Sequence, residues 1–93
     1  MTCYVDDMNT PFGRMVMCHL IADSTDELLR MVRLIGVNPK WIQHVGTYKE
    51  HFDISLGKKK LAIEHGAQEI SFTKLGRMVV ARKGSPLAKE STS

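Results

Sequence analysis

The stretch Arg14–Gly36, RMVMCHLIADSTDELLRMVRLIG, decides the fold because it joins a strand pattern directly to a helix pattern. Residues 15–22 place largely apolar side chains on both alternating faces, which is typical of a central β-strand that is covered on both sides. Ser24 followed by Glu27 forms a capping box, and the acidic residues here favour a helix N-terminus. Apolar residues at helical spacing then continue to Gly36, which supplies a left-handed stop. The stretch therefore predicts a buried strand and an amphipathic helix of about three turns.

The segments on either side predict further strands and a second helix. Residues 2–5 form a short β-branched and aromatic run that ends in two aspartates. A helix is expected after Asp53, capped by Asp53 or Ser55, and Gly66 is expected to end it. The remaining pattern predicts a loop or turn at residues 9–13, a third strand at 67–72, a turn at 73–77 and a fourth strand at 78–81.

This order of elements predicts an α/β (α+β) fold, in which a small mixed sheet of about four strands is covered by two helices. The 93 residues are enough for one domain with one modest core. We assign residues 1–83 to that single globular domain. From Gly84 the composition turns to Ser, Pro, Lys and Glu without an apolar period, so residues 84–93 are expected to form a disordered tail.

Composition and cysteine spacing limit the class of protein. The formal net charge of +3 permits attraction to an anionic ligand but falls short of the basic density of a nucleic-acid coat, so nucleic acid stays open as a partner. Cys3 and Cys18 stand in separate apolar runs and are interpreted as small buried hydrophobes in a reducing compartment. No stretch approaches the roughly 20 apolar residues of a membrane span. We expect a cytoplasmic protein without a membrane partner, and a homo-oligomer stays open.

Charged and polar side chains gather in residues 51–60, HFDISLGKKK. His51 and Asp53 lie two residues apart, so their side chains point the same way on an extended segment. The lysines at 58–60 follow in the first turns of the expected helix, where cations oppose the macrodipole unless they are solvated or an anion joins them. We interpret them as candidates for holding a phosphate or carboxylate, with a solvated charged face as the alternative.

Asp6 and His19 are candidates for the same site. Asp6 ends the first strand and could help to hold a divalent cation, although the neighbouring Asp7 would point to the opposite face, and a solvated turn carboxylate is the alternative. His19 lies on an otherwise apolar strand face. It is either a structural histidine with a hydrogen-bond partner or a member of a metal or acid/base cluster with His51 and Asp53.

Trp41 and Gln43 lie in a short segment that precedes the loop at residues 46–50. An aromatic plane and an amide can bind a ring by stacking and hydrogen bonding, which makes both residues candidates for ligand binding. The alternative is that Trp41, the only tryptophan, anchors the core.

Several short blocks of sequence occur in a characteristic order within residues 2–71. They are YVDD at residues 4–7, HLIADS at 19–24, WIQ at 41–43 and HFD at 51–53, followed by Lys58-Lys59. Together they resemble a family of small bacterial and phage proteins catalogued as a domain of unknown function. In that family the third block usually reads Trp-Phe-Gln and the basic block Lys-Arg, so Ile42 and Lys59 depart from it. The resemblance implies a compact intracellular domain with a polar pocket and carries no established activity across.

The leading hypothesis from the sequence is a binding module for a small phosphate-bearing ligand such as a nucleotide derivative. Lys58 and Lys59 would hold the anion, and Trp41 and Gln43 would contact the ring. The polar remainder of the site would be Asp6, His19, His51 and Asp53. If the source is a phage, sequestering a host nucleotide signal would be an anti-defence function that suits so small a protein.

Two alternatives come from other classes of protein. One is a metal-assisted phosphoester hydrolase or nuclease, in which Asp6 or Asp7 acts with His51 and Asp53 and a divalent metal ion supplies hydroxide. The other is a module that binds a host protein through the basic helix and tail. Whether the protein is an enzyme stays undecided at this point. If it is one, the expected catalytic residues are His51, Asp53 and His19, and a divalent metal ion is the one cofactor considered.

Overall fold

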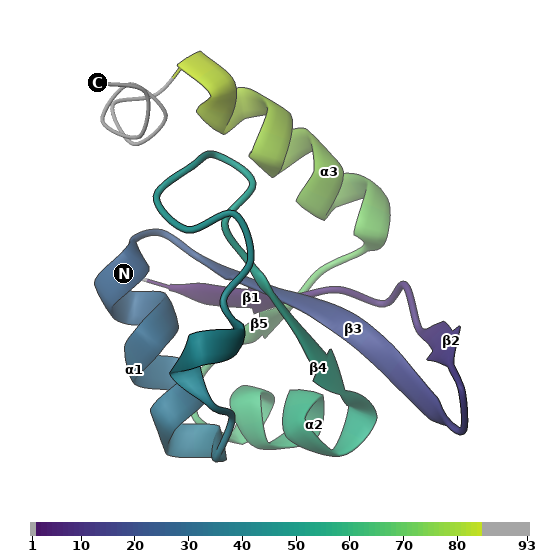
Figure 1. Ribbon diagram of the computed structural model, residues 1–93. Coiled ribbons are helices and arrows are strands. Elements are labelled where there is room, and N and C mark those ends of the chain that lie inside the picture. Colours follow the sequence, from purple (N-terminus) through teal and green to yellow (C-terminus); the bar gives the residue numbers. More distant parts are fainter. Residues whose placement is uncertain (1, 85–93) are drawn as a thin grey trace.

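A five-stranded mixed sheet and three α-helices make up residues 2–84, the part of the chain that the computed structural model describes (Figure 1). The elements are β1 (Cys3–Val5), β2 (Thr10–Phe12), β3 (Met15–Ala22), α1 (Thr25–Ile35), the 3₁₀ turn η1 (Pro39–Trp41), β4 (Phe52–Ser55), α2 (Leu56–Glu64), β5 (Gln68–Glu69), α3 (Phe72–Ala81) and the 3₁₀ turn η2 (Arg82–Gly84). The expected α+β class is confirmed. Within these residues, none of the helices combines the length and the apolar character needed to cross a membrane. Apart from Gly84, the expected tail lies outside the described residues.

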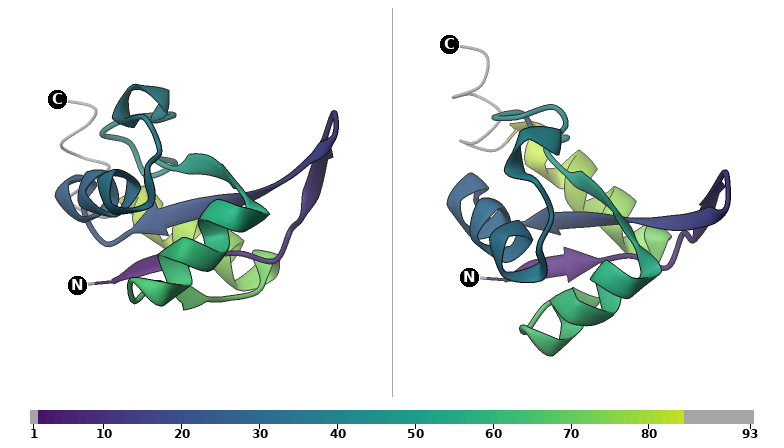
Figure 2. Two further views of the ribbon diagram at one scale, coloured as in Figure 1. Left: turned by 90° about the horizontal axis from the view of Figure 1, so that it is seen from below. Right: turned by 60° about the horizontal axis from the view of Figure 1, so that its bottom comes forward.

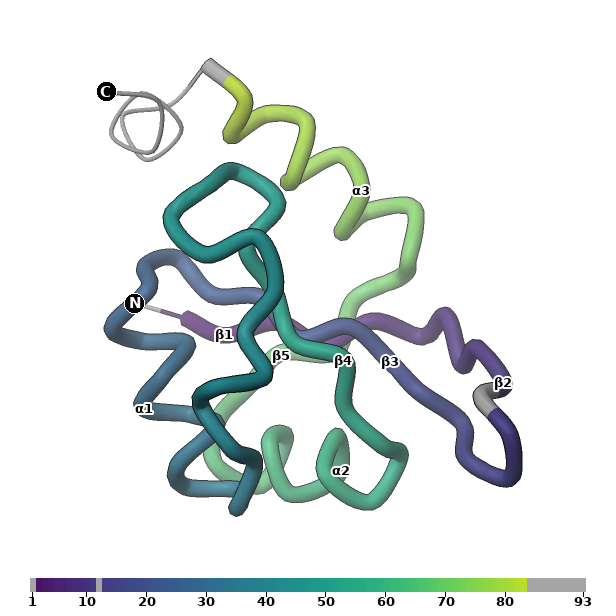
Figure 3. The backbone as a smooth tube through the Cα atoms, in the orientation of Figure 1, coloured from purple at the N-terminus to yellow at the C-terminus, as the bar shows by residue number. Residues whose placement is uncertain are grey.

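Strand β3 organises the sheet. Its two ends pair antiparallel with β1 and β2, its middle pairs antiparallel with β4, and β5 joins β1 in parallel. The backbone path in Figure 3 shows β3 running through the middle of the molecule. The register between β3 and β4 sets His19 opposite Asp53 and Leu20 opposite Phe52. Because side chains alternate along a strand, these two pairs lie on opposite faces of the sheet.

The two faces of the sheet are covered by different helices. Helices α1 and α2 lie side by side over the face that carries Leu20, Phe52 and Ile54, and this face holds the main core (Figure 2). Helix α3 lies apart from them and packs Leu75 against Ile21 in a smaller apolar cluster. The main core therefore stabilises one face, and the other face stays partly open.

Helix α1 begins and ends where the sequence predicts. The Ser24 Oγ accepts a hydrogen bond from the Glu27 N–H at 3.2 Å, and Gly36 adopts a left-handed φ of 81°. Cys3 and Cys18 are both buried and free, as expected for small hydrophobes. The signals at these positions are local, which is why they could be read correctly.

Several elements expected in the second half of the chain and in the first loop differ in the structure. The expected turn at 73–77 and strand at 78–81 form helix α3, whose N-cap Ser71 accepts from the Lys74 N–H at 3.1 Å. Of the two caps expected for the helix after Asp53, Ser55 is the one that caps α2, and Asp53 lies in strand β4. The loop expected at 9–13 contains β2, and the third strand is reduced to β5. Pairing with β3 decides β2 and β4, and that pairing leaves no local signal.

Two glycine substitutions test the helix assignments with opposite signs. Gly36→Ala should lower the free energy of unfolding by about 1–2 kcal/mol, because alanine is strained in the left-handed region. Its Cβ would also lie 3.1 Å from the Lys58 Nζ. Gly76→Ala should raise the free energy of unfolding by about 0.5–1 kcal/mol, since Gly76 lies inside α3 and an added methyl group would meet open space. Urea denaturation measures both, and effects of the same sign would contradict the assignment of α3.

Candidate functional site

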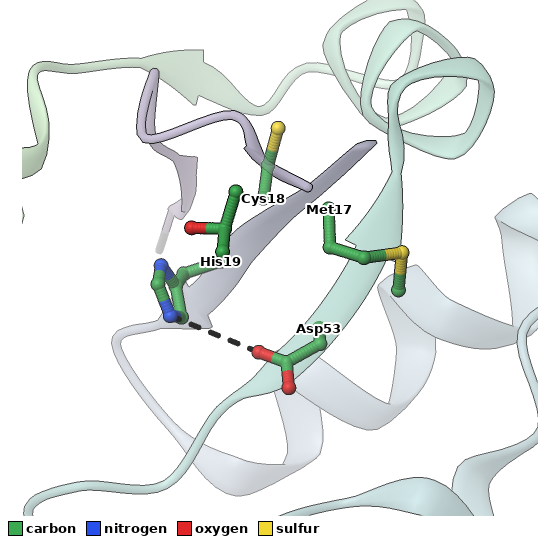
Figure 4. A pocket seen from close by; sticks show the side chains of 5 residues that line it. Met17, Cys18, His19 and Asp53 are labelled. Atoms are coloured by element: carbon green, nitrogen blue, oxygen red, sulfur yellow. Dashed lines mark ion pairs between the residues drawn. The ribbon is translucent and has the colours of Figure 1, made fainter. Parts of the chain in front are cut away.

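His19, His51 and Asp53 come together on the face of the sheet that α3 partly covers. One ligand atom from each lies within 4.8 Å of the other two, and within residues 2–84 this is the one such group of three. The Asp53 Oδ1 lies 3.5 Å from the His51 Nε2 and 3.8 Å from the His19 Nε2. Figure 4 shows the side chains of His19 and Asp53 pointing toward one another from neighbouring strands.

Strand pairing explains why these residues meet. His19 on β3 and Asp53 on β4 are register partners, so their side chains emerge on the same face. His51 lies two residues before Asp53 and shares its side of the chain. The closeness of His51 and Asp53 follows from the sequence, whereas His19 reaches them through the sheet.

Each imidazole is held through the nitrogen that faces away from Asp53. The His19 Nδ1 lies 2.7 Å from the Asp6 Oδ2, and the His51 Nδ1 lies 2.7 Å from the Lys49 carbonyl oxygen. Because a carbonyl oxygen only accepts hydrogen bonds, the His51 Nδ1 is the donor, and the neutral ring then presents its Nε2 lone pair toward Asp53. Metal-binding histidines in proteins typically have this pattern, with the second nitrogen bound to a carboxylate or a carbonyl.

Asp6 is fully buried and orients His19 twice. Its Oδ1 accepts from the His19 backbone N–H at 2.9 Å while its Oδ2 faces the ring at 2.7 Å. Asp7 points elsewhere, and its Oδ1 accepts from the Phe72 N–H at the start of α3 at 2.8 Å. Asp6 therefore supports the cluster from behind, rather than offering a further ligand atom to it.

Asp53 is oriented in the same manner by Gln43. The Gln43 Nε2 donates to the Asp53 Oδ2 at 2.6 Å, which leaves Oδ1 directed at the two imidazoles. The backbone of Gln43 also exchanges hydrogen bonds with that of His51, at 2.9 and 3.1 Å. The sequence predicts that Gln43 contacts a ligand ring, and in the structure it positions the carboxylate of the cluster.

The two distances from the Asp53 Oδ1 to the imidazole nitrogens are close to those of a divalent transition-metal site, and the two nitrogens lie within 4.8 Å of each other. A tetrahedral site with metal–nitrogen distances of about 2.0–2.1 Å has ligand atoms about 3.3 Å apart. The observed 3.5 and 3.8 Å exceed that value by only a few tenths of an ångström. Two histidines and one carboxylate are the ligands of catalytic zinc sites and of non-haem iron sites, both of which keep positions open for water or substrate. Without a metal, the Asp6–His19 pair could act as a general base.

The loop before His51 is anchored by a buried carboxylate. Glu50 is 3% exposed and accepts hydrogen bonds from the Thr25 Oγ1 at 2.8 Å and the Gly46 N–H at 2.7 Å. His44, in the same loop, has a positive φ of 53° and stacks on the His51 ring at 5.8 Å. Sequence reasoning missed Glu50, His44 and Lys49, because a polar loop without repeats gives no sign of which side chains fold inward.

The structure does not bring the predicted basic residues to this cluster. Lys59 is buried and forms an ion pair with Glu69 at 2.7 Å. Burial by itself disfavours the charged amine, but the hydrogen bond and charge of Glu69 outweigh it and raise the pKa of Lys59. The charged form of Lys59 stabilises the fold at neutral pH, and this contribution is lost as the pH rises through the raised pKa. The Lys58 Nζ lies beside Gly36 at the end of α1.

Trp41 is 67% exposed in η1, so it does not anchor the core, which was the alternative to ligand binding.

The two cysteines do not take part in the chemistry of the cluster. Burial raises the pKa of the Cys18 thiol, and it raises that of Cys3 to about 11. Both are therefore protonated at neutral pH and are poor nucleophiles.

Two hollows adjoin the cluster and share His19. The larger, of about 280 Å³, is lined by Thr10, Met17, Cys18, His19 and Asp53 (Figure 4). The smaller, of about 210 Å³, lies between α3 and the loop and is lined by His19, Ile21, His44, Lys49, His51, Leu75 and Val79. A metal held by the cluster would thus be reachable from two sides.

A family model described as "Protein of unknown function (DUF4031)" matches residues 3–82. The chain belongs to this family. The resemblance inferred from the short sequence blocks is confirmed, and the matched range of the DUF4031 family contains Asp6, His19, Gln43, His51 and Asp53. No match was found among curated proteins or among solved structures.

Cobalt titration tests the metal centre directly. The protein should bind one Co²⁺ with the visible absorption of a low-symmetry site, and His51→Asn should weaken binding by at least about 100-fold, because loss of a ligand exceeds the 10–100-fold effect of its supporting partners. His65→Asn is the matched control, since His65 is the C-cap of α2 and lies outside the cluster. Equal affinity in the two variants would exclude this centre.

Asp6→Asn tests the support of His19. An amide can donate to the His19 Nδ1 and so favours the tautomer whose Nε2 carries the proton and cannot bind a metal. We expect Co²⁺ affinity to fall by about 10–100-fold while the visible spectrum at saturation is retained. Unchanged affinity, in a variant whose circular dichroism matches that of the parent, would show that Asp6 does not orient the ring.

Proposed function

We propose that this protein is a divalent-metal-dependent hydrolase of phosphoesters. The observation that carries the proposal is the convergence of the His19 Nε2, the His51 Nε2 and the Asp53 Oδ1, with the outer nitrogen of each ring already hydrogen-bonded. Side chains oriented in this way suit metal binding better than a purely structural hydrogen-bond network, in which the inner nitrogens would be expected to have closer partners.

Three protein ligands leave coordination positions for water and for a phosphoryl oxygen. A bound divalent metal lowers the pKa of its water toward neutrality and so supplies a nucleophile. In the proposed hydrolysis, water would add to phosphorus, so that one P–O bond forms and the P–O bond to the alcohol breaks, while His19, His51 and Asp53 would hold the metal. One proton of the water ends on the departing alcohol, and the products are an alcohol and a phosphate.

Local charge supports an anionic substrate. The side chains of Lys49 and His44 line the hollow next to His51, and the metal would add two positive charges to the single carboxylate of Asp53. A nucleotide derivative, the ligand expected from the sequence, is itself a phosphoester and falls within this substrate class. Lys58 and Lys59 have no part in the proposal, since one lies beside α1 and the other pairs with Glu69.

A binding function without cleavage would use the same centre. A metal-loaded site could hold a nucleotide signal through its phosphate, and this would be an anti-defence function if the source is a phage. The two functions differ in turnover alone, so one assay series separates them.

Hydrolysis of p-nitrophenyl phosphate and bis(p-nitrophenyl) phosphate tests the proposal. Protein loaded with Zn²⁺, Mn²⁺, Co²⁺ or Fe²⁺ should release nitrophenolate, and a chelator should stop the reaction. Asp53→Asn should lower the rate by more than about 100-fold, since it removes a ligand charge. Asp26→Asn, an exposed acid in the first turn of α1, is the matched control and should keep the parent rate.

Different outcomes lead to different conclusions. Stoichiometric metal binding with calorimetric heat from nucleotides but no turnover would replace the hydrolase with a binding module. Failure to bind any of the four metals, together with no turnover, would contradict both the hydrolase and the metal-dependent binding module.

A further inference from the structure

We infer that the hollow between α3 and the loop of residues 43–50 binds the organic group of the substrate, and that this group is a single apolar or aromatic ring attached to the anionic phosphoryl group. The inference rests on the proposed function, because the metal centre defines where the phosphoryl group lies. It adds the class of substrate and the residues that select it.

The hollow and the metal cluster form one continuous site. His19 and His51 belong to both, each offering its Nε2 to the cluster and its ring to the wall of the hollow. Figure 3 shows the loop, in teal, and α3 lying next to each other. A substrate bound to the metal through its phosphoryl oxygen would therefore have its organic group directed into this space.

The size and lining of the hollow suit one ring. Its volume is about 210 Å³, and an apolar cavity of about 150 Å³ is known to hold benzene. Ile21 forms part of the floor, and Leu75 and Val79 form the wall on α3. These side chains offer dispersion contacts and apolar burial, and no polar side chain on this wall would require a hydrogen bond from the ligand.

The side of the hollow that faces the apolar wall carries cationic and imidazole side chains. The lining side chains that the structure describes are cationic, imidazole or apolar, and none carries a carboxylate. Lys49 reaches this rim from the loop, whereas the larger hollow on the other side of His19 includes Asp53 in its lining. An organic ring in the smaller hollow has no carboxylate in its lining, whereas the same ring in the larger hollow would lie against Asp53.

Two adjacent valines on α3 provide a matched test. Val79 lines the hollow, while Val80 is 69% exposed and is not among the lining residues. Val79→Phe adds a ring to the wall and should fill the space. Val80→Phe adds the same ring to the same helix away from the hollow.

The experiment compares phenylphosphonate with methylphosphonate, which share the anionic group and resist hydrolysis. Isothermal titration of the Co²⁺-loaded parent should show phenylphosphonate binding about tenfold more tightly, the factor expected when part of a phenyl ring is buried. Val79→Phe should remove that preference and leave methylphosphonate and Co²⁺ affinity unchanged. Val80→Phe should keep the preference. Lys49→Met, at an exposed position where folding is not at risk, should weaken both phosphonates by a similar factor.

The results separate this inference from the proposed function. Co²⁺ binding with equal affinity for the two phosphonates in the parent overturns the ring pocket and leaves the metal centre standing. Retention of the phenyl preference in Val79→Phe places the ring elsewhere and likewise overturns the inference. If the parent protein does not bind Co²⁺, both the ring pocket and the metal centre are overturned.

Discussion

The register of β4 against β3 is the constraint on which the rest depends. It sets Asp53 opposite His19 on one face and Phe52 opposite Leu20 in the core on the other. A slip of one residue would exchange the two faces, exposing the phenyl group and burying the carboxylate. The apolar core therefore fixes the polar cluster, since the pairing that satisfies one face determines the other. The packing of Phe52 against the core is therefore enough to place Asp53 opposite His19.

The parts of the fold and of the cluster that could be predicted from the sequence are those that depend on residues close together in the chain. Helix α1 is predicted correctly from Ser24 to Gly36, because caps and helical spacing are local. The His51–Asp53 pair is also predictable, since two residues on one extended segment share a side. The hydrogen bond that Asp6 accepts from His19 spans 13 residues, and the pairing of His19 with Asp53 spans more, so neither could be derived from spacing. Helix α3 is mistaken for a turn and a strand because Gly76 and a β-branched run outweigh its helical pattern.

The lysines at the start of α2 show how tertiary contacts alter a local pattern. Cations at a helix N-terminus oppose the macrodipole, and this conflict suggests an anionic ligand. In the structure Lys58 extends to the C-terminal end of α1, where a cation is favourable, and Lys59 is neutralised by Glu69 of β5. Neighbouring elements of the same chain thus provide the negative charge. The lysine that lines a hollow beside the cluster is Lys49, in the loop before β4, where no run of basic residues marks it.

The anchoring of Glu50 bears on how a ligand would enter. Its carboxylate ties the loop at Gly46 to Thr25, the first residue of α1, and it does so without exposure to solvent. A loop fastened in this way cannot swing as a lid unless the first turn of α1 frays, which would leave a buried anion without donors. A ligand would then enter and leave through the two hollows that adjoin the cluster, one beside α3 and the other beside Thr10 and Met17. Access to the cluster would be controlled by rotation of side chains and not by opening of the backbone.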